Sequence, residues 1–247
     1  MKKLTTCLML GSLLFQTACD NKTKLNDPHK IYFATAGEYP PFEYKQRGEL
    51  KGFDIALAQR VAKELGKEAV FEDMSFASIL PALSSGQVDA AISTITLTKA
   101  RKKNFDFTMP YYFEGMAAVF RKNEPVKTIS QFAGKKLAAQ LGSTMELWLK
   151  KHAAHEVLVV MDNNNQAIEA LKAGHVDMVL MDGAQGAIFS RKNPILSYAL
   201  IAKSEEGYAI ALPKHSRITR QMNQILASLI QKGEIEKLKQ TWLEQTA

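Results

Sequence analysis

Small polar side chains follow two apolar runs of the chain that are typical of buried strands. Ser93, Thr94 and Thr96 come directly after the first run, and Asp182 comes directly after the second. Ligands of open α/β sheets bind outside the carboxyl ends of the strands. If the two runs belong to facing lobes, hydroxyls lie on one wall of a ligand site and a carboxylate on the other. The alternative for Asp182 is a helix N-cap or a turn residue, and its position in the sequence favours neither.

Groups that could hold an anion lie near the same strand ends. Thr98 is a predicted N-cap, which puts Arg101 on the first turn of a helix close to Thr96. Its guanidinium could hold a carboxylate through two charge-assisted hydrogen bonds, a contact worth about 1.5–3 kcal/mol. Ser143 and Thr144 lead from a strand into another helix, whose first N–H groups could bind an anion. The alternatives are a solvated surface charge for Arg101 and a common helix start for the other two residues.

Aromatic side chains lie in or beside loops that follow predicted strands. These are Tyr39, Phe42 and Phe76, and Glu38 adds a carboxylate directly before Tyr39. Core packing is the commoner position of a phenylalanine, and solvation at the surface is the commoner position of a glutamate. The aromatics are therefore candidates for contacts with a ligand, and core packing remains open for the two phenylalanines.

Several other chemistries find no support in the sequence. It has no glycine-rich phosphate loop, no Gly-x-Ser-x-Gly turn and no cysteine pair for a metal, and His152 and His155 stand without further ligands. We therefore expect no cofactor, no metal and no catalytic residue. Lys and Arg number 32 against 25 Asp and Glu, which gives a net charge of +7. Because no dense basic block stands out, we expect no nucleic-acid partner.

The elements that must position these residues alternate between strands and helices. This order predicts mostly parallel sheets with helices on their faces. The predicted strands are 31–35, 69–71, 90–92, 136–139, 157–160 and 178–181, and the predicted helices are 53–65, 78–85, 144–151, 166–173 and an amphipathic segment at 218–243 that Gly233 interrupts.

One short stretch of the chain occurs twice. The sequence ALSSGQVD at 82–89 and the sequence ALKAGHVD at 170–177 share five of eight residues, at a constant separation of 88. Each copy contains the end of a helix, a glycine C-cap, a tight turn and the start of a buried strand. At the same separation Thr94 corresponds to Asp182. The repeat predicts two similar α/β lobes, although any αβ unit has a comparable pattern.

The N-terminus has the features of a secretory signal peptide. A basic start is followed by a short apolar run, so we assign residues 1–18 to the signal and residues 19–27 to a polar tether. The run Thr17-Ala18-Cys19 resembles a bacterial lipoprotein box, which predicts a lipid on Cys19 and anchoring to a membrane. The alternative is ordinary cleavage that leaves Cys19 free.

Seven motifs of the chain together resemble a known family. Over residues 31–243 the chain resembles the polar and basic amino-acid branch of bacterial periplasmic solute-binding proteins, which feed ABC importers. The motifs are EYPPFE at 38–43, GFDIA at 52–56, ILPAL at 79–83, DAAIS at 89–93, TLTKAR at 96–101, FTMPYY at 107–112 and LGST at 141–144.

The resemblance implies a fold, a location and partners. It implies a periplasmic-binding-protein-like clamshell of two α/β lobes with hinge crossings near 112–116 and 205–209. The first lobe is then residues 28–112 and 210–247, and the second is residues 117–204. The implied partners are a free L-amino acid and the membrane permease of an ABC transporter, and we expect a monomer in the periplasm.

The resemblance also implies how a zwitterion is held. Arg101 pairs with the α-carboxylate of the ligand, helped by Thr96 and by the helix start at Ser143 and Thr144. Asp182 takes the α-ammonium group.

The remaining implied contacts concern Asp182 and the ligand side chain. Ser93 or Thr94 assists Asp182, and Tyr39 and Phe76 sandwich the side chain, so that a cation between the rings gains cation–π attraction.

The nature of the ligand side chain is the most open part of this interpretation. Arginine-binding relatives often carry an acidic residue three positions before the tyrosine, but this chain has Ala36 there, and Glu38 could supply the carboxylate instead. We expect a basic L-amino acid, with arginine first and lysine or histidine next. The alternatives are glutamine or cystine, an enzyme on the same scaffold that resembles cyclohexadienyl dehydratase and would use Glu38 as its acid, or a sensory input domain.

Overall fold

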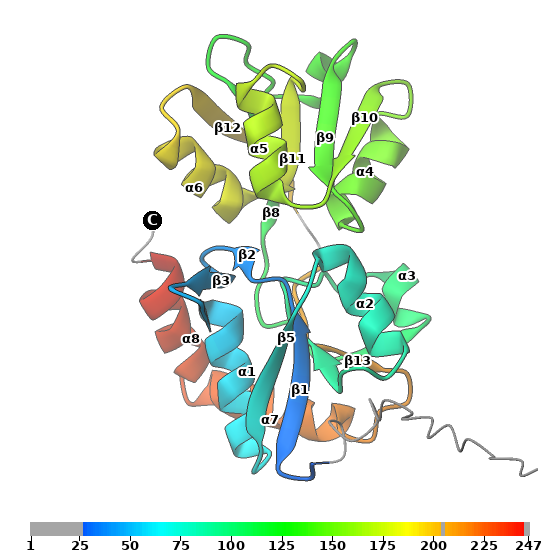
Figure 1. Cartoon of the computed structure of the whole chain (residues 1–247), viewed down its shortest axis with the longest axis vertical. Helices are drawn as coiled ribbons and strands as arrows, with labels where there is room; N and C mark the ends of the chain where they lie inside the picture. The colour runs from blue at the N-terminus through cyan, green and yellow to red at the C-terminus, as the bar shows by residue number, and fades with distance from the viewer. Residues whose placement is uncertain (1–26, 204–205, 245–247) are drawn as a thin grey trace, which may run out of the picture.

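The protein consists of two α/β lobes, each built around a five-stranded sheet (Figure 1). The computed structural model describes residues 27–203 and 206–244. The predicted signal peptide, Cys19 and all of the tether except Asp27 lie outside the described residues. The predicted fold class, a clamshell of two α/β lobes, is confirmed. None of the helices in the two described ranges is both long and apolar enough to cross a membrane.

The first lobe contains the N-terminal and C-terminal parts of the described chain. Its elements are β1 (Lys30–Thr35), β2 (Glu38–Tyr39), β3 (Glu43–Gln46), β4 (Glu49–Lys51), α1 (Phe53–Glu64), β5 (Glu68–Asp73), α2 (Phe76–Ser84), β6 (Ala90–Ala91), α3 (Lys99–Lys102), β7 (Phe105–Phe107), β13 (Ala211–Pro213), α7 (Thr219–Gln231), α8 (Glu234–Lys239) and the π-helical turn η3 (Gln240–Glu244).

The second lobe contains the middle of the chain. Its elements are β8 (Gly115–Arg121), the 3₁₀ turn η2 (Ile129–Phe132), β9 (Lys136–Gln140), α4 (Thr144–His152), β10 (Val157–Met161), α5 (Asn164–Lys172), β11 (Met178–Asp182), α6 (Gly183–Lys192) and β12 (Leu196–Lys203).

The two large sheets have the same topology. The strand order is β5-β1-β6-β13-β7 in the first lobe and β10-β9-β11-β8-β12 in the second. In each sheet the first three strands are parallel, and the fourth runs antiparallel to both of its neighbours. The repeat in the sequence therefore reflects a repeat in the fold.

The two aspartates that end the repeat have the same structural role. Asp89 Oδ2 accepts a hydrogen bond of 2.9 Å from the Tyr32 N–H, and Asp177 Oδ2 accepts one of 2.8 Å from the Lys136 N–H. The Asp89 carboxylate thus ties the start of β6 to β1, and the Asp177 carboxylate ties the start of β11 to β9. This explains why an aspartate follows the valine in both copies.

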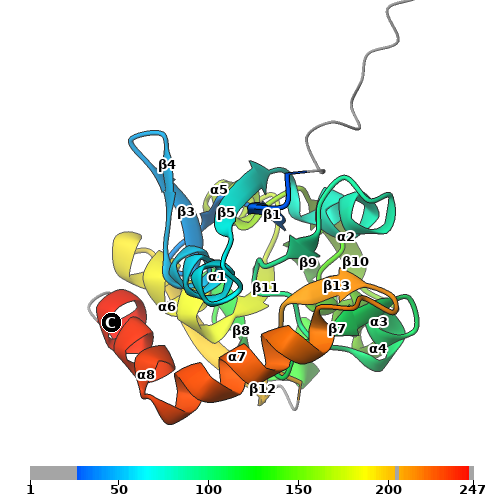
Figure 2. The same cartoon turned by 90° about the horizontal axis from the view of Figure 1, so that it is seen from below.

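Helices cover both faces of each sheet and form the core with it. In the first lobe α1, α7 and α8 pack on one face, as Figure 2 shows from below, and α2 packs on the other. In the second lobe α4 and η2 cover one face, and α5 and α6 cover the other. Gly233 separates α7 from α8 with a positive φ of 71°, so the predicted interruption of the last helix is confirmed.

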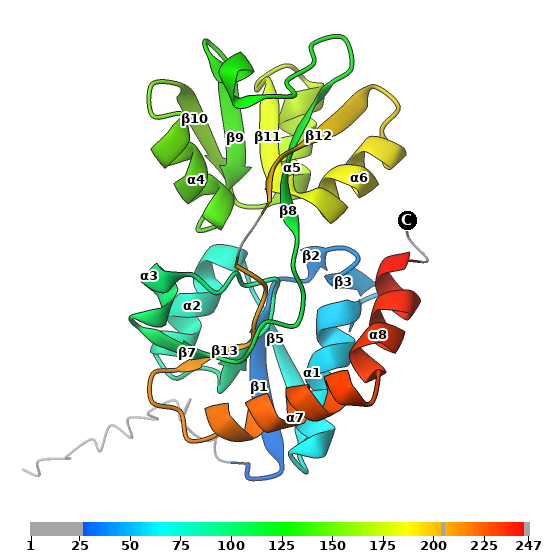
Figure 3. The ribbon, with the colours of Figure 1, turned by 180° about the vertical axis from the view of Figure 1, so that it is seen from behind.

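Two segments join the lobes side by side (Figure 3). The chain leaves the first sheet after β7 and enters the second at β8, and it returns between β12 and β13. Tyr112 and Tyr208 form an antiparallel bridge between the two segments, with a hydrogen bond of 2.8 Å from the Tyr208 N–H to the Tyr112 carbonyl. Glu205, one end of a predicted crossing, lies outside the described residues, and the lobe boundaries stay a prediction.

The sequence did not predict a small antiparallel sheet of the first lobe. Strands β2, β3 and β4 form this three-stranded sheet at the top of the lobe, beside the gap between the ribbons in Figure 1. Because the three strands are short and mostly polar, they lack the apolar alternation that identifies a strand from sequence.

Candidate ligand site between the lobes

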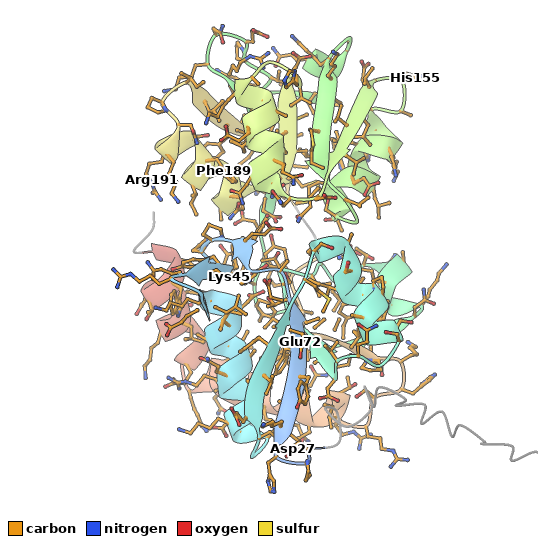
Figure 4. The ribbon with its side chains drawn as sticks, viewed as in Figure 1. Asp27, Lys45, Glu72, His155, Phe189 and Arg191 are labelled. Atoms are coloured by element: carbon orange, nitrogen blue, oxygen red, sulfur yellow. The ribbon has the colours of Figure 1, made fainter. Side chains whose placement is uncertain are left out.

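A pocket lies between the two lobes and is lined by residues of both. Side chains of both lobes reach into the space between the ribbons in Figure 4. Eight of the ten residues predicted for the site line this pocket, together with five others. The lining residues are Tyr39, Phe76, Thr94, Thr96, Arg101, Gln140, Ser143, Thr144, Met145, Asn164, Leu180, Met181 and Asp182.

Thr94 stands in the wall of the first lobe in an unusual backbone conformation. Its φ is 46°, in the left-handed region that β-branched residues rarely adopt. The Asp54 carboxylate holds Thr94 in this conformation. Its Oδ2 accepts a hydrogen bond of 2.7 Å from the Thr94 N–H and one of 2.8 Å from the Tyr111 hydroxyl. Burial raises the pKa of Asp54 to about 6, and these hydrogen bonds lower it in part.

Ser93 lies behind this wall and does not line the pocket. Its side chain is fully buried. Its Oγ donates a hydrogen bond of 2.8 Å to Glu43 Oε1 and accepts one of 3.2 Å from the Ala36 N–H. Burial and the neighbouring Asp54 carboxylate hold the pKa of Glu43 well above its ordinary value. The suggestion that Ser93 touches the ligand is therefore not supported by its position. Thr94 remains as the candidate to assist Asp182.

Arg101 spans the gap between the lobes. As predicted, Thr98 is the N-cap of the helix that contains Arg101, and its hydroxyl accepts a hydrogen bond of 3.1 Å from the Arg101 N–H. The guanidinium donates a hydrogen bond of 2.9 Å to the Thr96 carbonyl of its own lobe and one of 3.0 Å to the Gly142 carbonyl of the second lobe. It also lies over the Phe76 ring, 5.9 Å from the centroid. Burial lowers the pKa of Arg101 to about 10, which leaves the side chain charged at neutral pH.

The helix start of the second lobe faces Arg101. Ser143 is the N-cap of α4, and its Oγ accepts 3.1 Å from the Glu146 N–H. The hydroxyl oxygens of Thr144 and Thr96 lie 3.5 Å apart across the gap. The N–H groups of Thr144 and Met145 have no acceptor within the helix because they belong to its first turn. They are the groups of this helix start that an anion could use.

Asp182 lies at the end of β11, and its neighbours decide between the alternatives left open by the sequence. It occupies the N-cap position of α6, but its side chain makes no capping hydrogen bond there. Asp182 is 7% exposed and lines the pocket, and its carboxylate accepts a hydrogen bond from the Tyr39 hydroxyl of the first lobe. Burial raises the pKa of Asp182 to about 6, and the hydroxyls of Tyr208 and Tyr39 offset part of that rise.

Glu38 lies outside the pocket lining. Its backbone carbonyl accepts a hydrogen bond of 3.4 Å from Asn165 Nδ2 of the second lobe. Burial and the carboxylates of Asp73 and Asp162 raise the pKa of the Glu38 carboxyl. Its predicted role as the partner of a basic ligand side chain, or as the acid of an enzyme, is not supported by this position. Among the described residues that line the pocket, Asp182 is the one carboxylate.

The lining residues that the sequence did not predict all belong to the second lobe. Leu180 and Met181 belong to a predicted strand whose apolar residues are typical of a core. Asn164 is a polar residue at the start of a helix, which is typical of the surface. Gln140 carried a usable signal, because it follows a predicted strand in the same way as Thr94 follows another. No group of three or more His, Cys, Asp or Glu able to hold a metal occurs within residues 27–203 and 206–244.

Comparison with known proteins gives the family of the chain. The family of bacterial extracellular solute-binding proteins, family 3, matches residues 31–245. The chain belongs to this family. Its resemblance to the family, stated from the sequence, is thereby confirmed.

Relatives of this family member include proteins named for arginine. The arginine-binding extracellular protein ArtP of Bacillus subtilis is 33% identical over 250 residues, covering 98% of each chain. An ancestral arginine-binding protein, solved with arginine and also with glutamine, is 36% identical with a TM-score of 0.83 in both structures. The alignment to the arginine complex covers 87% of this chain and 98% of that one, and the alignment to the glutamine complex covers 87% and 97%.

Proposed function

We propose that this protein is the substrate-binding component of an ABC amino-acid importer and binds a basic L-amino acid, arginine first, between its lobes. The observation that carries the proposal is the pairing of opposite charges in one pocket, with Arg101 from the first lobe and Asp182 from the second. A free amino acid has both complementary charges on adjacent atoms.

Each charged end of the ligand has a set of partners in this proposal. The α-carboxylate binds Arg101, Thr96 and the start of α4 at Ser143 and Thr144. The α-ammonium binds Asp182, with Thr94 beside it. Water is excluded when the lobes close, which strengthens both charge pairs.

Two aromatic residues lie beside the ligand side chain in this proposal. Tyr39 and Phe76 line the pocket from the first lobe. A cationic side chain beside their rings gains cation–π attraction. The names of the relatives at 33% and 36% identity support arginine as the first ligand to test.

Closure of the lobes is the step that a permease would recognise. Contacts already join the lobes near the pocket: the Gln185 amide donates to the Pro40 carbonyl, and Asn165 Nδ2 donates to the Glu38 carbonyl. A ligand that bridges the lobes adds to these contacts and so favours the closed state. The protein acts as a monomer in the periplasm, held to the membrane by a lipid on Cys19.

Isothermal titration calorimetry with arginine, lysine, histidine, glutamine and cystine tests the proposal. We expect arginine to bind most tightly. Binding of glutamine or cystine without any basic amino acid would overturn the ligand assignment, and no binding of any amino acid by the folded protein would overturn the function.

A further inference from the structure

We propose that Asn164 and Gln140 recognise the ligand side chain, and that they select planar N–H donors, a guanidinium or a carboxamide, over the ammonium of lysine. We call these two residues the amide pair. The inference rests on the proposed function, because it assumes that the pocket holds an amino acid. It names the residues that decide which side chain is accepted.

Asn164 combines a place in the pocket with an unused hydrogen-bond acceptor. It is 4% exposed, lines the pocket, and its Oδ1 has no hydrogen-bond partner among the described residues. The start of α5 does not need this side chain, because Asn163 is the N-cap and accepts 2.9 Å from the Gln166 N–H. Buried polar atoms are almost always paired. A donor from the ligand would satisfy this oxygen.

Gln140 brings a second amide to the same pocket. It is the last residue of β9 and is 7% exposed. Its Nε2 donates a hydrogen bond of 3.3 Å to the Asp162 carbonyl, which lies in the loop that leads into α5. One of the two N–H groups of the amide is used by this contact, and the amide oxygen is an acceptor that can take a hydrogen bond from a donor of the ligand.

The charges of the pocket decide which donors the amide pair prefers. Arg101 and Asp182 are the charged residues among the described lining residues, and the zwitterion uses both. The ligand side chain therefore meets neutral oxygens. Guanidinium is planar and weakly hydrated, whereas the lysine ammonium is compact and strongly hydrated. Burying an ammonium without an ionised partner is costly, so arginine and glutamine are favoured over lysine.

Calorimetry with four ligands tests this selection. The ligands are arginine, glutamine, lysine and norvaline, an α-amino acid whose side chain has no N–H group. For the wild-type protein we expect arginine and glutamine to bind at least tenfold more tightly than lysine and norvaline. The Asn164→Leu variant should bring arginine and glutamine close to norvaline, with norvaline itself unchanged. The Asn164→Asp variant should strengthen lysine at least tenfold.

Controls separate recognition from folding. Gln166→Leu removes an exposed amide of the same helix that does not line the pocket, and it should leave all four affinities unchanged. Thermal unfolding checks that both Asn164 variants fold. A wild-type preference for lysine, or an equal change for all four ligands in Asn164→Leu, would overturn the inference while the proposed function stands. Failure of the folded wild-type protein to bind any of them would refute both.

Discussion

The Tyr39 hydroxyl of the first lobe donates a hydrogen bond to the Asp182 carboxylate of the second. This contact joins the lobes at the place where the α-ammonium of a ligand would bind in the proposed function. It also stabilises the ionised form of a carboxyl whose burial favours the neutral form. The protonation of Asp182 is therefore linked to ligand binding and to the position of Tyr39.

Arginine affinity should depend on the ionisation of Asp182. The pKa of Asp182 is raised to about 6, and an ammonium group binds the ionised form. Affinity should therefore rise as pH increases toward 6 and level off above it, with about a tenfold loss for each pH unit below the midpoint. Calorimetry between pH 4.5 and 8 measures this profile. Asp182→Asn should bind more weakly and lose the profile; an unchanged profile in that variant would contradict the assignment.

The Tyr39→Phe variant should move the midpoint of that profile. It keeps the aromatic ring but removes the hydroxyl that lowers the pKa of Asp182. The pKa of Asp182 should then rise further, and half-maximal arginine affinity should occur at a higher pH than in the wild-type protein. The matched control is Tyr44→Phe, on β3 outside the pocket lining. A midpoint at or below that of the wild-type protein would show that the Tyr39 hydroxyl does not stabilise the ionised carboxylate.

The Arg101→Ala variant should lose most amino-acid binding. It removes the guanidinium proposed to hold the α-carboxylate, so we expect the affinity for arginine to fall at least about a hundredfold, in line with the larger charge-assisted contacts. Arg101→Lys should be intermediate because it keeps the charge without the paired N–H groups. Arg60→Ala, at a surface ion pair with Glu234, is the control and should bind normally. Wild-type affinity in Arg101→Ala would refute the role of Arg101.

The stability of the first lobe should fall as pH rises through the titration of Asp54. Its pKa is about 6 in the folded protein and about 3.9 in an unfolded chain, so the folded state binds the proton more tightly. The stabilisation is fully present below pH 4 and is lost as pH rises to 6, by about 3 kcal/mol. The pKa of Glu43 is also raised, so its titration likewise lowers the free energy of unfolding as pH rises.

The Asp54→Asn variant tests this pH dependence of stability. The amide keeps an oxygen for the Thr94 N–H but does not titrate. Urea unfolding at pH 4, 5, 6 and 7 should show a smaller loss of stability with rising pH than the wild-type protein has. Asp106→Asn, at a surface ion pair with Lys214, should keep the wild-type slope. Equal slopes for Asp54→Asn and the wild-type protein would mean that Asp54 does not titrate as proposed.

Much of the fold could be predicted because it depends on local patterns. The helix predicted at 53–65 forms at Phe53–Glu64, and the strand predicted at 178–181 forms at Met178–Asp182. Apolar spacing identifies the buried face of an element within a few residues of sequence. The repeat of 82–89 at 170–177 predicted two similar lobes, and the shared topology of the two sheets agrees with it.

The candidate site could be predicted only as far as strand ends indicate it. Strand ends brought eight of the ten predicted residues to one pocket. They could not show that Ser93 turns to Glu43 or that Asp182 receives the Tyr39 hydroxyl instead of capping α6. They also could not place Asn164 in the pocket. These contacts join residues up to 143 positions apart. The Tyr39–Asp182 pair meets only because the two lobes lie against each other, and the Ser93–Glu43 pair meets only through the fold of the first lobe. No local pattern records the direction in which such a side chain points.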